Sequence, residues 1–336
     1  MATTQIADVI VPEVFTPYVE EQSNKADRLV RSQAVVVSDA ISGMLAGGGA
    51  TFSVPSFNPI TNPDDDYAVS NDDPSSIATP AKLTTRAQVA VRLETNKSWA
   101  SADLAAALAG SDPMAAAAMK LGEYQASRRQ RVLVKQLTGM FAATNMSGAV
   151  NDVSIATGTI AAANLISADN VIDTTSAWGD YASNNVGKVL VVHSDVHRRL
   201  QKQNLIDFTP TNVQDIGFGT YLGMTLLVDD GCVKDTTTPS YPVYTSYIIG
   251  QGGIGFGYNR PKVPVAIQRE ELQGNGAGVE YLIMRDCFSY HVSGMKWLGA
   301  SVAGAIPTLA ELATAANWTR VFDQKMIPIA ALQTNG

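Results

Sequence analysis

The sequence predicts a mixed α+β protein, and three observations support this fold class. Residues 112–141 start with Asp112-Pro113 and continue without another proline, which predicts a single helix about 40 Å long. The segments after Tyr244 are nearly all β-like, and residues 43–100 are typical of two strands joined by a long polar connection. A chain of 336 residues is long enough to bury a sizeable core in one large domain or in two or three smaller ones.

Composition and charge argue against several classes of protein. Hydrophobic residues make up 46% of the chain and charged residues 16%, which is typical of a globular protein that is somewhat poor in charge. The net charge of -7 argues against a dedicated nucleic-acid binder, because such proteins usually carry a basic excess. Cys232 and Cys287 are far apart and lack C-x-x-C spacing, so we interpret them as reduced thiols.

The N-terminal segment lacks the features of a targeting sequence. Its acidic residues Asp8 and Glu13 replace the basic region of a signal peptide, and no run in the chain reaches the roughly eighteen apolar residues of a membrane span. We therefore expect a chain that folds in a cytoplasm and does not contact a membrane. Residues 6–15 are apolar and extended, and Thr16-Pro17 is a typical helix start. An extended arm with one helix cannot bury itself, so it needs another surface to lie on.

Residues 43–100 predict a long two-stranded hairpin with a polar, acidic end. The runs TFSVPSF and TTRAQVAVRLE alternate polar and apolar residues, as half-exposed strands do. Residues 58–80, which lie between them, contain no lysine or arginine and are rich in proline, asparagine and aspartate. A cation site is one interpretation, but the glycine and terminal glutamate of a calcium loop are missing, so a solvated acidic face is favoured. The acidic residues are Asp64, Asp65, Asp66, Asp72 and Asp73.

The helical region that follows carries a basic stripe. Ser101 is a candidate cap for a short helix that ends at Gly110, and the long helix then runs to Phe141. Arg128, Arg131 and Lys135 fall at i, i+3 and i+7 and so share one helix face. This basic stripe is either a solvated face or a contact for something negative, and the sequence leaves both interpretations open.

The spacing of glycines in the second half of the chain suggests a dinucleotide site, but the residues that follow them argue against it. Gly250, Gly252 and Gly255 have G-x-G-x-x-G spacing after a β-like run, but prolines follow where the fingerprint requires a helix. We interpret these glycines as turn residues between two strands. Upstream, residues 161–230 alternate helix and strand patterns, with a strand at KVLVV and a helix capped at Ser194. Downstream, GNGAG (274–278) is typical of a hairpin turn.

The best catalytic candidate is a zinc site built from His193, His197 and His291. Histidines four residues apart bind zinc when both lie on one helix face, but His193 ends a predicted strand and the glutamate of an H-E-x-x-H motif is missing. No nucleophile elbow, phosphate-binding loop or kinase motif is present in the sequence. The sequence therefore predicts no catalytic residue, no cofactor, no metal and no enzyme, with a zinc-dependent hydrolase as the less favoured alternative.

In their order along the chain, these segments resemble the major capsid (coat) proteins of tailed bacteriophages. The resemblance starts with ADVIVPEVFTPYV and continues with SADLAAALAGSDPMAAAAMKLGEYQASRRQRVLVKQLTGMF and KVLVVHSDVHRRLQKQNLI. It then covers YIIGQGGIGFG through YLIMRDCFSYHVSGMKW and ends with NWTRVFDQKMIPIAAL. The likeness spans nearly the whole chain. No single motif is diagnostic, but the ordered set is fairly specific.

The resemblance implies a fold with an N-terminal arm (1–42), an extended E-loop hairpin (43–100) and a peripheral domain built on a long spine helix (101–150 with 260–336). It also implies an axial domain between them (151–259). In function, it implies a structural protein that assembles as hexamers and pentamers into an icosahedral head around double-stranded DNA, with assembly in the bacterial host cytoplasm. An encapsulin-like compartment shell is the alternative of related fold.

The resemblance also implies partners and roles for the two charged groups. The scaffold is expected to be a separate protein unless an N-terminal piece has been removed, and portal and decoration proteins are further expected partners. The aspartates at the hairpin tip are expected to meet basic groups on a neighbouring subunit. The basic stripe is expected either to face packaged DNA without reading its sequence or to pair with acids across a subunit boundary.

Overall fold

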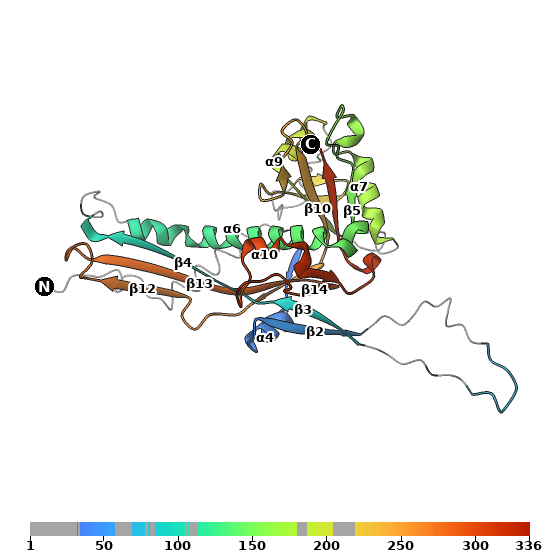
Figure 1. Cartoon of the computed structure of the whole chain (residues 1–336), viewed down its shortest axis with the longest axis horizontal. Helices are drawn as coiled ribbons and strands as arrows, with labels where there is room; N and C mark the ends of the chain where they lie inside the picture. The colour runs from blue at the N-terminus through green and yellow to red at the C-terminus, as the bar shows by residue number, and fades with distance from the viewer. Residues whose placement is uncertain are drawn as a thin grey trace, which may run out of the picture.

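The protein has three parts: a long flat body, a smaller upper domain that stands on the body, and a hairpin that extends beyond one end of it (Figure 1). The upper domain packs against the long helix of the body, and the hairpin points away from both. This computed structural model describes residues 32, 34–57, 69–77, 80, 85–104, 107, 113–179, 187–203 and 219–336.

The body is built on one five-stranded sheet. Its central strand, β13, pairs antiparallel with β4, β11 and β12, while β1 extends the sheet parallel to β11. At fourteen residues β13 is long enough to pair with β12 and β11 in turn along one side and with β4 along the other. The strands are β1 (Val35–Val37), β4 (Leu93–Ala102), β11 (Ile254–Tyr258), β12 (Val265–Glu270) and β13 (Val279–Val292).

The long helix α6 (Pro113–Ala142) lies along this sheet (Figure 1). Pro113 occupies its first position, where the missing backbone N–H costs nothing and the fixed φ suits a helix. Leu121 packs with Leu282 and Met284 of β13 in a small apolar cluster, and the second half of α6 enters the main core. Gly139 allows a close approach: a Cβ there would lie 2.2 Å from the carbonyl oxygen of Leu312.

The upper domain contains a seven-stranded mixed sheet in the order β5-β16-β10-β6-β8-β7, with β9 beside β10. Alternate residues of its strands face two different cores. Leu190 and Val192 pack under α7 (Ala168–Thr175) and α9 (Ser194–Lys202), whereas Val189 and Val191 face the core shared with α6. The strands are β5 (Val150–Asp152), β6 (Lys188–Val192), β7 (Thr220–Tyr221), β8 (Met224–Val228), β9 (Lys234–Asp235), β10 (Val243–Gly250) and β16 (Ile329–Thr334).

Shorter elements complete the described structure. The hairpin consists of β2 (Thr51–Phe57) and β3 (Thr85–Val91). A second strand pair, β14 (Met295–Trp297) and β15 (Trp318–Arg320), brings the rings of Trp297 and Trp318 into edge-to-face contact. The remaining helices are α4 (Asp39–Ala46) and α10 (Leu309–Leu312), with 3-10 turns η1 (Thr144–Ala149), η2 (Ala162–Asn164), η3 (Ser176–Trp178), η4 (Ala315–Asn317) and η5 (Gln324–Met326).

The glycine motif is a turn and a packing site, as the flanking prolines indicated. Gly252 adopts φ 71° in the turn between β10 and β11. Gly255 and Gly257 lie under α4: a Cβ on them would lie 2.4 Å and 2.5 Å from side-chain atoms of Ile41. The absence of side chains at these two positions therefore lets α4 sit directly on the body sheet.

Several local predictions are wrong. Ser101 lies in β4 and does not cap a helix, and α4 was not predicted at all. The first helical residue of α9 is Ser194, but its cap is His193, whose ring accepts a hydrogen bond from the Asp195 N–H. The Asp112 cap of the long helix lies outside the described residues.

Three strands also fall across the predicted domain limits. β4 (Leu93–Ala102) and β11 (Ile254–Tyr258) belong to the body sheet, although the limits placed most of β4 in the hairpin and β11 in the axial domain. β16 (Ile329–Thr334) lies inside the upper sheet, between β5 and β10. Local patterns identify a strand but not its partners, so strands that leave one part of the chain to join the sheet of another cannot be assigned from them.

Candidate assembly surfaces

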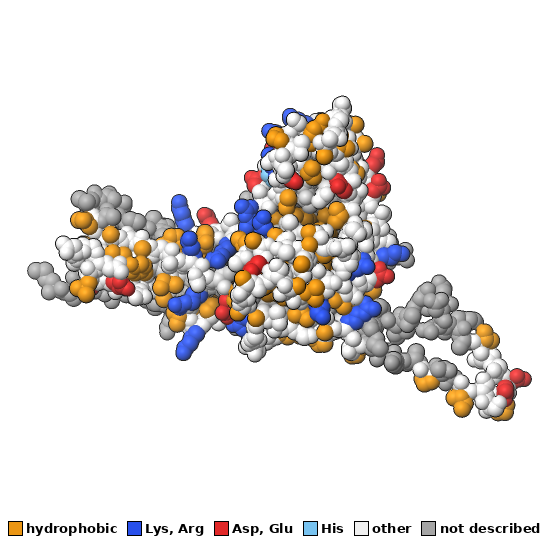
Figure 2. Space-filling model, in the orientation of Figure 1, with side chains coloured by type: hydrophobic (Ala, Val, Ile, Leu, Met, Phe, Trp, Pro, Cys, Tyr) orange, Lys and Arg blue, Asp and Glu red, His pale blue; other side chains and the backbone are white. Residues whose placement is uncertain are grey.

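The two strands of the hairpin differ in exposure. Exposed and half-buried residues alternate along β2, whereas Gln88, Ala90 and Val91 of β3 are buried. Near the tip-side end of the paired strands, Arg86 donates to the carbonyl oxygen of Val321 at 2.5 Å and so ties β3 to the body. At the tip, residues 69–77 are all exposed, including Val69 at 78% and Ile77 at 89%. Apolar and acidic side chains are both visible at this end of the molecule (Figure 2).

The described tip aspartates lie in a tight polar turn. Asp73 accepts hydrogen bonds from the backbone N–H and the hydroxyl of Ser75, at 2.9 Å and 2.7 Å. These bonds lower the pKa of Asp73, so its carboxylate keeps its charge at neutral and mildly acidic pH. Asp72 is exposed beside it. The predicted tip residues Asp64, Asp65 and Asp66 lie outside the described residues.

A buried polar contact joins the hairpin to the body. The side-chain oxygen of Gln88 in β3 accepts from His291 Nε2 at 2.9 Å and from the backbone N–H of Gly294 at 2.7 Å. Because Gln88 Oε1 can only accept, His291 carries its proton on Nε2. Burial lowers the pKa of His291 to about 4, so the ring is neutral at physiological pH.

An ion pair in the body was missed by the sequence analysis. Arg129 of α6 contacts Asp286 of β13 through two bonds, Nε to Oδ2 at 3.0 Å and Nη2 to Oδ1 at 2.9 Å, and both side chains are buried. The guanidinium also lies within 6 Å of the ring centres of Phe256, Tyr258 and Phe288. In the sequence Arg129 stands between the polar residues Arg128 and Gln130, and its partner is 157 residues away, so no local pattern distinguishes it.

The basic stripe lies on the part of α6 that faces a hollow. Arg128 donates to the carbonyl oxygen of Asn96 in β4 at 3.2 Å, and Arg131 is exposed. Both line a hollow of about 780 Å³ that is bordered on the upper-domain side by Val228–Gly231. Lys135 is half-buried one turn further along α6 and is not among the residues that line this hollow.

The far side of the hollow is acidic. Asp229 and Asp230 both border it, and Asp229 Oδ1 accepts from the backbone N–H of Gly231 at 2.7 Å. Arg131 is close by, because a Cβ on Gly231 would lie 3.3 Å from its Nη1. The stripe therefore meets carboxylates of its own chain at one end.

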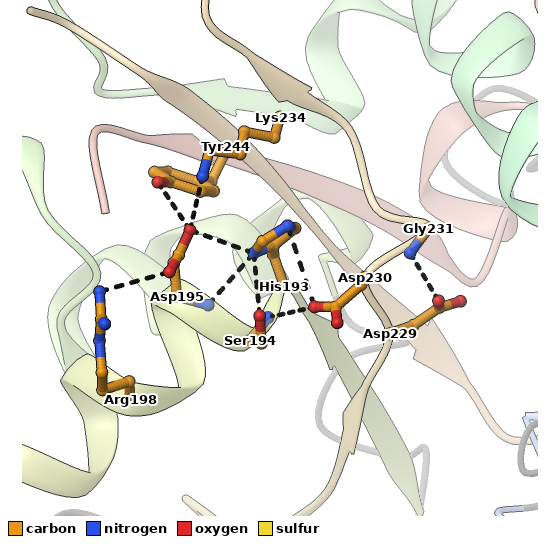
Figure 3. A network of polar contacts seen from close by, with 9 residues as sticks. All are labelled: His193, Ser194, Asp195, Arg198, Asp229, Asp230, Gly231, Lys234 and Tyr244. Carbon is orange, nitrogen blue, oxygen red and sulfur yellow. Dashed lines mark hydrogen bonds and ion pairs between the residues drawn. The ribbon is translucent and has the colours of Figure 1, made fainter.

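A network of polar contacts fixes α9 in the upper domain (Figure 3). Asp195 accepts from Lys234 Nζ at 2.7 Å, from the Tyr244 hydroxyl at 3.1 Å and from Arg198 at 3.3 Å. The contacts with Lys234 and Tyr244 lower the pKa of Asp195. His193 caps α9 from the same side, 3.9 Å from a carboxylate oxygen of Asp230. The network consists of side chains that neutralise one another within one subunit.

The histidines of the proposed zinc site are not brought together. His193 and His197 belong to α9 in the upper domain, whereas His291 lies in the body sheet and bonds Gln88. Among the described residues no group of three metal-ligating side chains is close enough to hold an ion. In the same part of the chain, no helix is long and apolar enough to cross a membrane. Cys232 and Cys287 are both buried as free thiols.

Comparison with known proteins identifies the family. No protein-family model matches the chain. The chain is 34% identical over 331 residues to the major capsid protein of Bacillus phage SPP1, which covers 98% of this chain and 97% of that protein.

Solved structures show the same fold at low sequence identity. The capsid of Ralstonia phage GP4 matches with a TM-score of 0.56 and 10% identity, over 85% of this chain and 84% of that chain. The capsid of cyanophage Pam1 matches with a TM-score of 0.53 and 12% identity, over 87% of each chain.

These findings decide between the alternatives that the sequence left open. The relatives are phage capsid proteins, so the encapsulin-like compartment and the zinc-dependent hydrolase are both wrong. The capsid structures confirm the expected mixed helix-and-sheet capsid fold over 85% and 87% of this chain. The chain belongs to the major capsid proteins of tailed bacteriophages.

Proposed function

We propose that many copies of this chain, arranged as hexamers and pentamers, form the icosahedral shell of a phage head around double-stranded DNA. The observation that carries this proposal is the 34% identity to a phage major capsid protein over nearly the full length of both chains. The protein is thus a component of the virion, assembled in the cytoplasm of the bacterial host. We propose a structural role for it and assign it no catalytic residue.

The exposed hairpin supports a role between subunits. Val69 and Ile77 are largely exposed, as are all of the described tip residues 69–77. Covering exposed apolar side chains with another surface is favourable. We assign this cover to a neighbouring copy, with the carboxylates of Asp72 and Asp73 meeting basic groups there. Burial of this kind stabilises the assembly and not the monomer.

The two globular parts correspond to the peripheral and axial domains of the capsid fold. We assign the body sheet with α6 to the peripheral domain and the seven-stranded sheet with α7 and α9 to the axial domain. On this assignment, the sheet partners of β4 and β11 support their place in the peripheral domain, and those of β16 support its place in the axial domain. The predicted N-terminal arm, residues 1–42, is described only from residue 32, and we keep its role between subunits as part of the proposal.

The net charge of the chain supports a shell that encloses DNA without binding it strongly. The chain carries a net charge of -7, and contacts with phosphate strengthen with the number of basic groups that the protein presents. Any contact with the genome is therefore local, and the basic stripe on α6 is the candidate for it. Such contacts position DNA without reading its sequence. A scaffold, a portal and decoration proteins are the other partners that the proposal includes.

Electron microscopy of purified particles tests the proposal. The expected result is an icosahedral shell with a portal at one vertex and DNA inside. A small shell filled with an enzyme cargo, or a protein that stays monomeric during head production, would contradict it. Metal analysis of wild-type protein and of the His197→Ala variant provides an independent check: stoichiometric zinc that is lost in the variant would restore the hydrolase interpretation.

A further inference from the structure

The two helices that cover the upper domain carry opposite charges. Helix α7 has the sequence ADNVIDTT, with Asp169 and Asp173 and no basic residue. Helix α9 has the sequence SDVHRRLQK, in which three basic residues stand against Asp195. The formal charges are therefore −2 for α7 (two acids, no base) and +2 for α9 (three bases, one acid).

The charged side chains of both helices are exposed, although Arg198 also contacts Asp195 of its own helix at 3.3 Å. On α7, Asp169, Ile172 and Asp173 point to solvent, and the side chain of Ile172 is 56% exposed. On α9, Arg198 and Lys202 are exposed. Asp195, the acid of α9, contacts Lys234 at 2.7 Å as well as Arg198.

The two charged helices lie on different sides of the domain. Figure 1 shows α9 towards the left of the upper domain and α7 towards the right, and both helices cover the same face of its sheet. Figure 2, in the same orientation, shows basic side chains over the α9 side and acidic side chains over the α7 side. Next to α9 is a hollow of about 240 Å³ bordered by Arg198, Arg199 and Lys202. One subunit therefore presents a basic, hollowed surface and, separately, an acidic helix with one exposed isoleucine.

We propose that the α9 surface of one copy binds the α7 helix of the next copy, so that successive upper domains close a ring. A contact between two different surfaces of the same protein repeats from copy to copy and closes when the rotation between copies divides a full turn. The carboxylates of Asp169 and Asp173 then face Arg198 and Lys202, and Ile172 is covered by the aliphatic parts of those basic side chains. The proposal rests on the assembly of this chain into a shell.

A second copy of the chain is the occupant that the charges favour. The two surfaces carry equal and opposite formal charge, and a shell protein always has further copies beside it. Opposite charges also guide the approach, since complementary potentials fix the register of two surfaces and suppress like-with-like pairing. Two α7 helices facing each other would place four carboxylates together, so a contact of identical surfaces is disfavoured.

Cysteine pairs test which surfaces meet. Asp173→Cys and Lys202→Cys, combined in one chain, should be linked by a short bis-maleimide in assembled particles, giving a ladder of covalent oligomers on a denaturing gel. The native Cys232 and Cys287 are buried and should not react in folded protein. Each single-cysteine variant should give monomers. Dimers from Asp173→Cys alone, or no ladder from the double variant, would overturn the proposal.

Charge reversal gives the second readout. Asp173→Lys and Lys202→Glu should each lower the yield of shells about tenfold, because each places like charges together at every repeat of the contact. The combination of both should restore assembly, which a merely structural defect would not do. Assembly of the wild-type protein shows whether the proposed function or only this inference has failed. If the wild type forms no shells, the proposed function fails; if it does and both single variants assemble normally, this inference fails.

Discussion

Arg129 and Asp286 form a buried, two-bonded ion pair that joins the middle of the long helix to the central strand of the body. Their side chains are 4% and 1% exposed. Desolvation of two charges is costly, and the pair is tolerated because the two bonds at 2.9 Å and 3.0 Å and the surrounding aromatic rings compensate it. The pair thus fixes the position of α6 along β13.

We expect removal of one partner to destabilise the subunit strongly. Arg129→Met leaves the Asp286 carboxylate buried without its cation, which should lower the free energy of unfolding by about 3–5 kcal/mol. Arg129→Met combined with Asp286→Leu should recover most of this loss, because no buried charge remains. Urea denaturation of the isolated subunit measures both. Glu94→Gln is the control: it breaks the more exposed pair with Arg92 and should cost at most about 1 kcal/mol.

The glycines of β11 should not tolerate side chains. In Gly257→Ala the new Cβ would lie 2.5 Å from Ile41 Cγ2 and 3.0 Å from two backbone atoms of α4, so the helix must shift. We expect a loss of about 1–3 kcal/mol, and a smaller loss for Gly255→Ala, whose nearest contact is the end of the Ile41 side chain. Gly43→Ala, with open space around it in α4, should be neutral or stabilising. Equal melting temperatures for all three variants would contradict this account.

The buried His291 should make stability depend on pH. Its pKa is about 4 in the folded protein and 6.5 when unperturbed, so between these values the unfolded chain takes up a proton that the folded chain does not. Unfolding therefore becomes easier as pH falls from 6.5 to 4, by about 3 kcal/mol in total, and levels off below. The variant His291→Gln, which still can donate to Gln88, should lack this contribution. Urea titrations of both proteins between pH 7 and pH 4 measure the difference; identical pH profiles would exclude it.

Sequence patterns recovered the parts of the fold that local chemistry specifies. The 30-residue α6 follows from Pro113 and the absence of a later proline, and the turn at Gly252 follows from the prolines that rule out a helix there. The partners of strands were not recoverable. β16 joins the upper sheet from the end of the chain, and its pattern contains nothing that distinguishes one sheet from another.

For the candidate surfaces too, local features could be predicted from the sequence and tertiary features could not. The acidic hairpin tip and the basic stripe were visible because their charges lie close together in sequence. The Arg129–Asp286 pair and the opposite charges of α7 and α9 depend on the tertiary arrangement, and distances between remote residues are not encoded in local spacing. The cap of α9 at His193 was missed for a different reason, because serine is the residue that usually occupies this position.

The hairpin tip should change its protease sensitivity on assembly. Residues 58–80 contain no lysine or arginine, so trypsin cannot cut there, and a protease that cleaves before aspartate is the appropriate probe. We expect cleavage at Asp72 and Asp73 in the isolated subunit and protection in the shell. Cleavage at the buried Asp286 should be absent in both states and serves as the control for folding. Equal cleavage of the tip in both states would argue against a contact with a neighbouring subunit.

The same tip should make assembly sensitive to salt. Because the charges of Asp72 and Asp73 are exposed, their attraction to basic groups on a neighbour is screened over about 10 Å at 0.1 M salt. Raising the salt concentration should therefore lower the yield of shells, and Asp72→Asn with Asp73→Asn should remove most of that dependence. Light scattering during assembly measures it. Assembly of the wild type that is indifferent to salt would count against an ionic role for the tip.

The prediction about the basic stripe on α6 is the one that experiment can most easily contradict. Changing Arg128, Arg131 and Lys135 together to glutamine removes three positive charges and keeps shorter, hydrogen-bonding side chains at these positions. If the stripe faces the packaged genome, shells should form in normal yield but package or retain DNA poorly, because repulsion between phosphates is then less screened. If the stripe pairs with acids of a neighbouring hairpin or arm, shells should fail to form.

Arg131 lies near Gly231 and lines the same hollow as Asp230, so it can also contribute to the stability of the isolated subunit. The experiment must separate this effect from effects on assembly and DNA retention. The melting temperature of the isolated variant measures this contribution, which should be small because Arg131 is exposed. Lys97→Gln with Lys262→Gln removes exposed basic charge elsewhere on the body and controls for net charge. We expect normal shells with poor DNA retention for the stripe variant and normal retention for the control. Normal shells with normal DNA in both would remove both roles, since a face that screens phosphate or pairs with acids cannot lose three charges without effect.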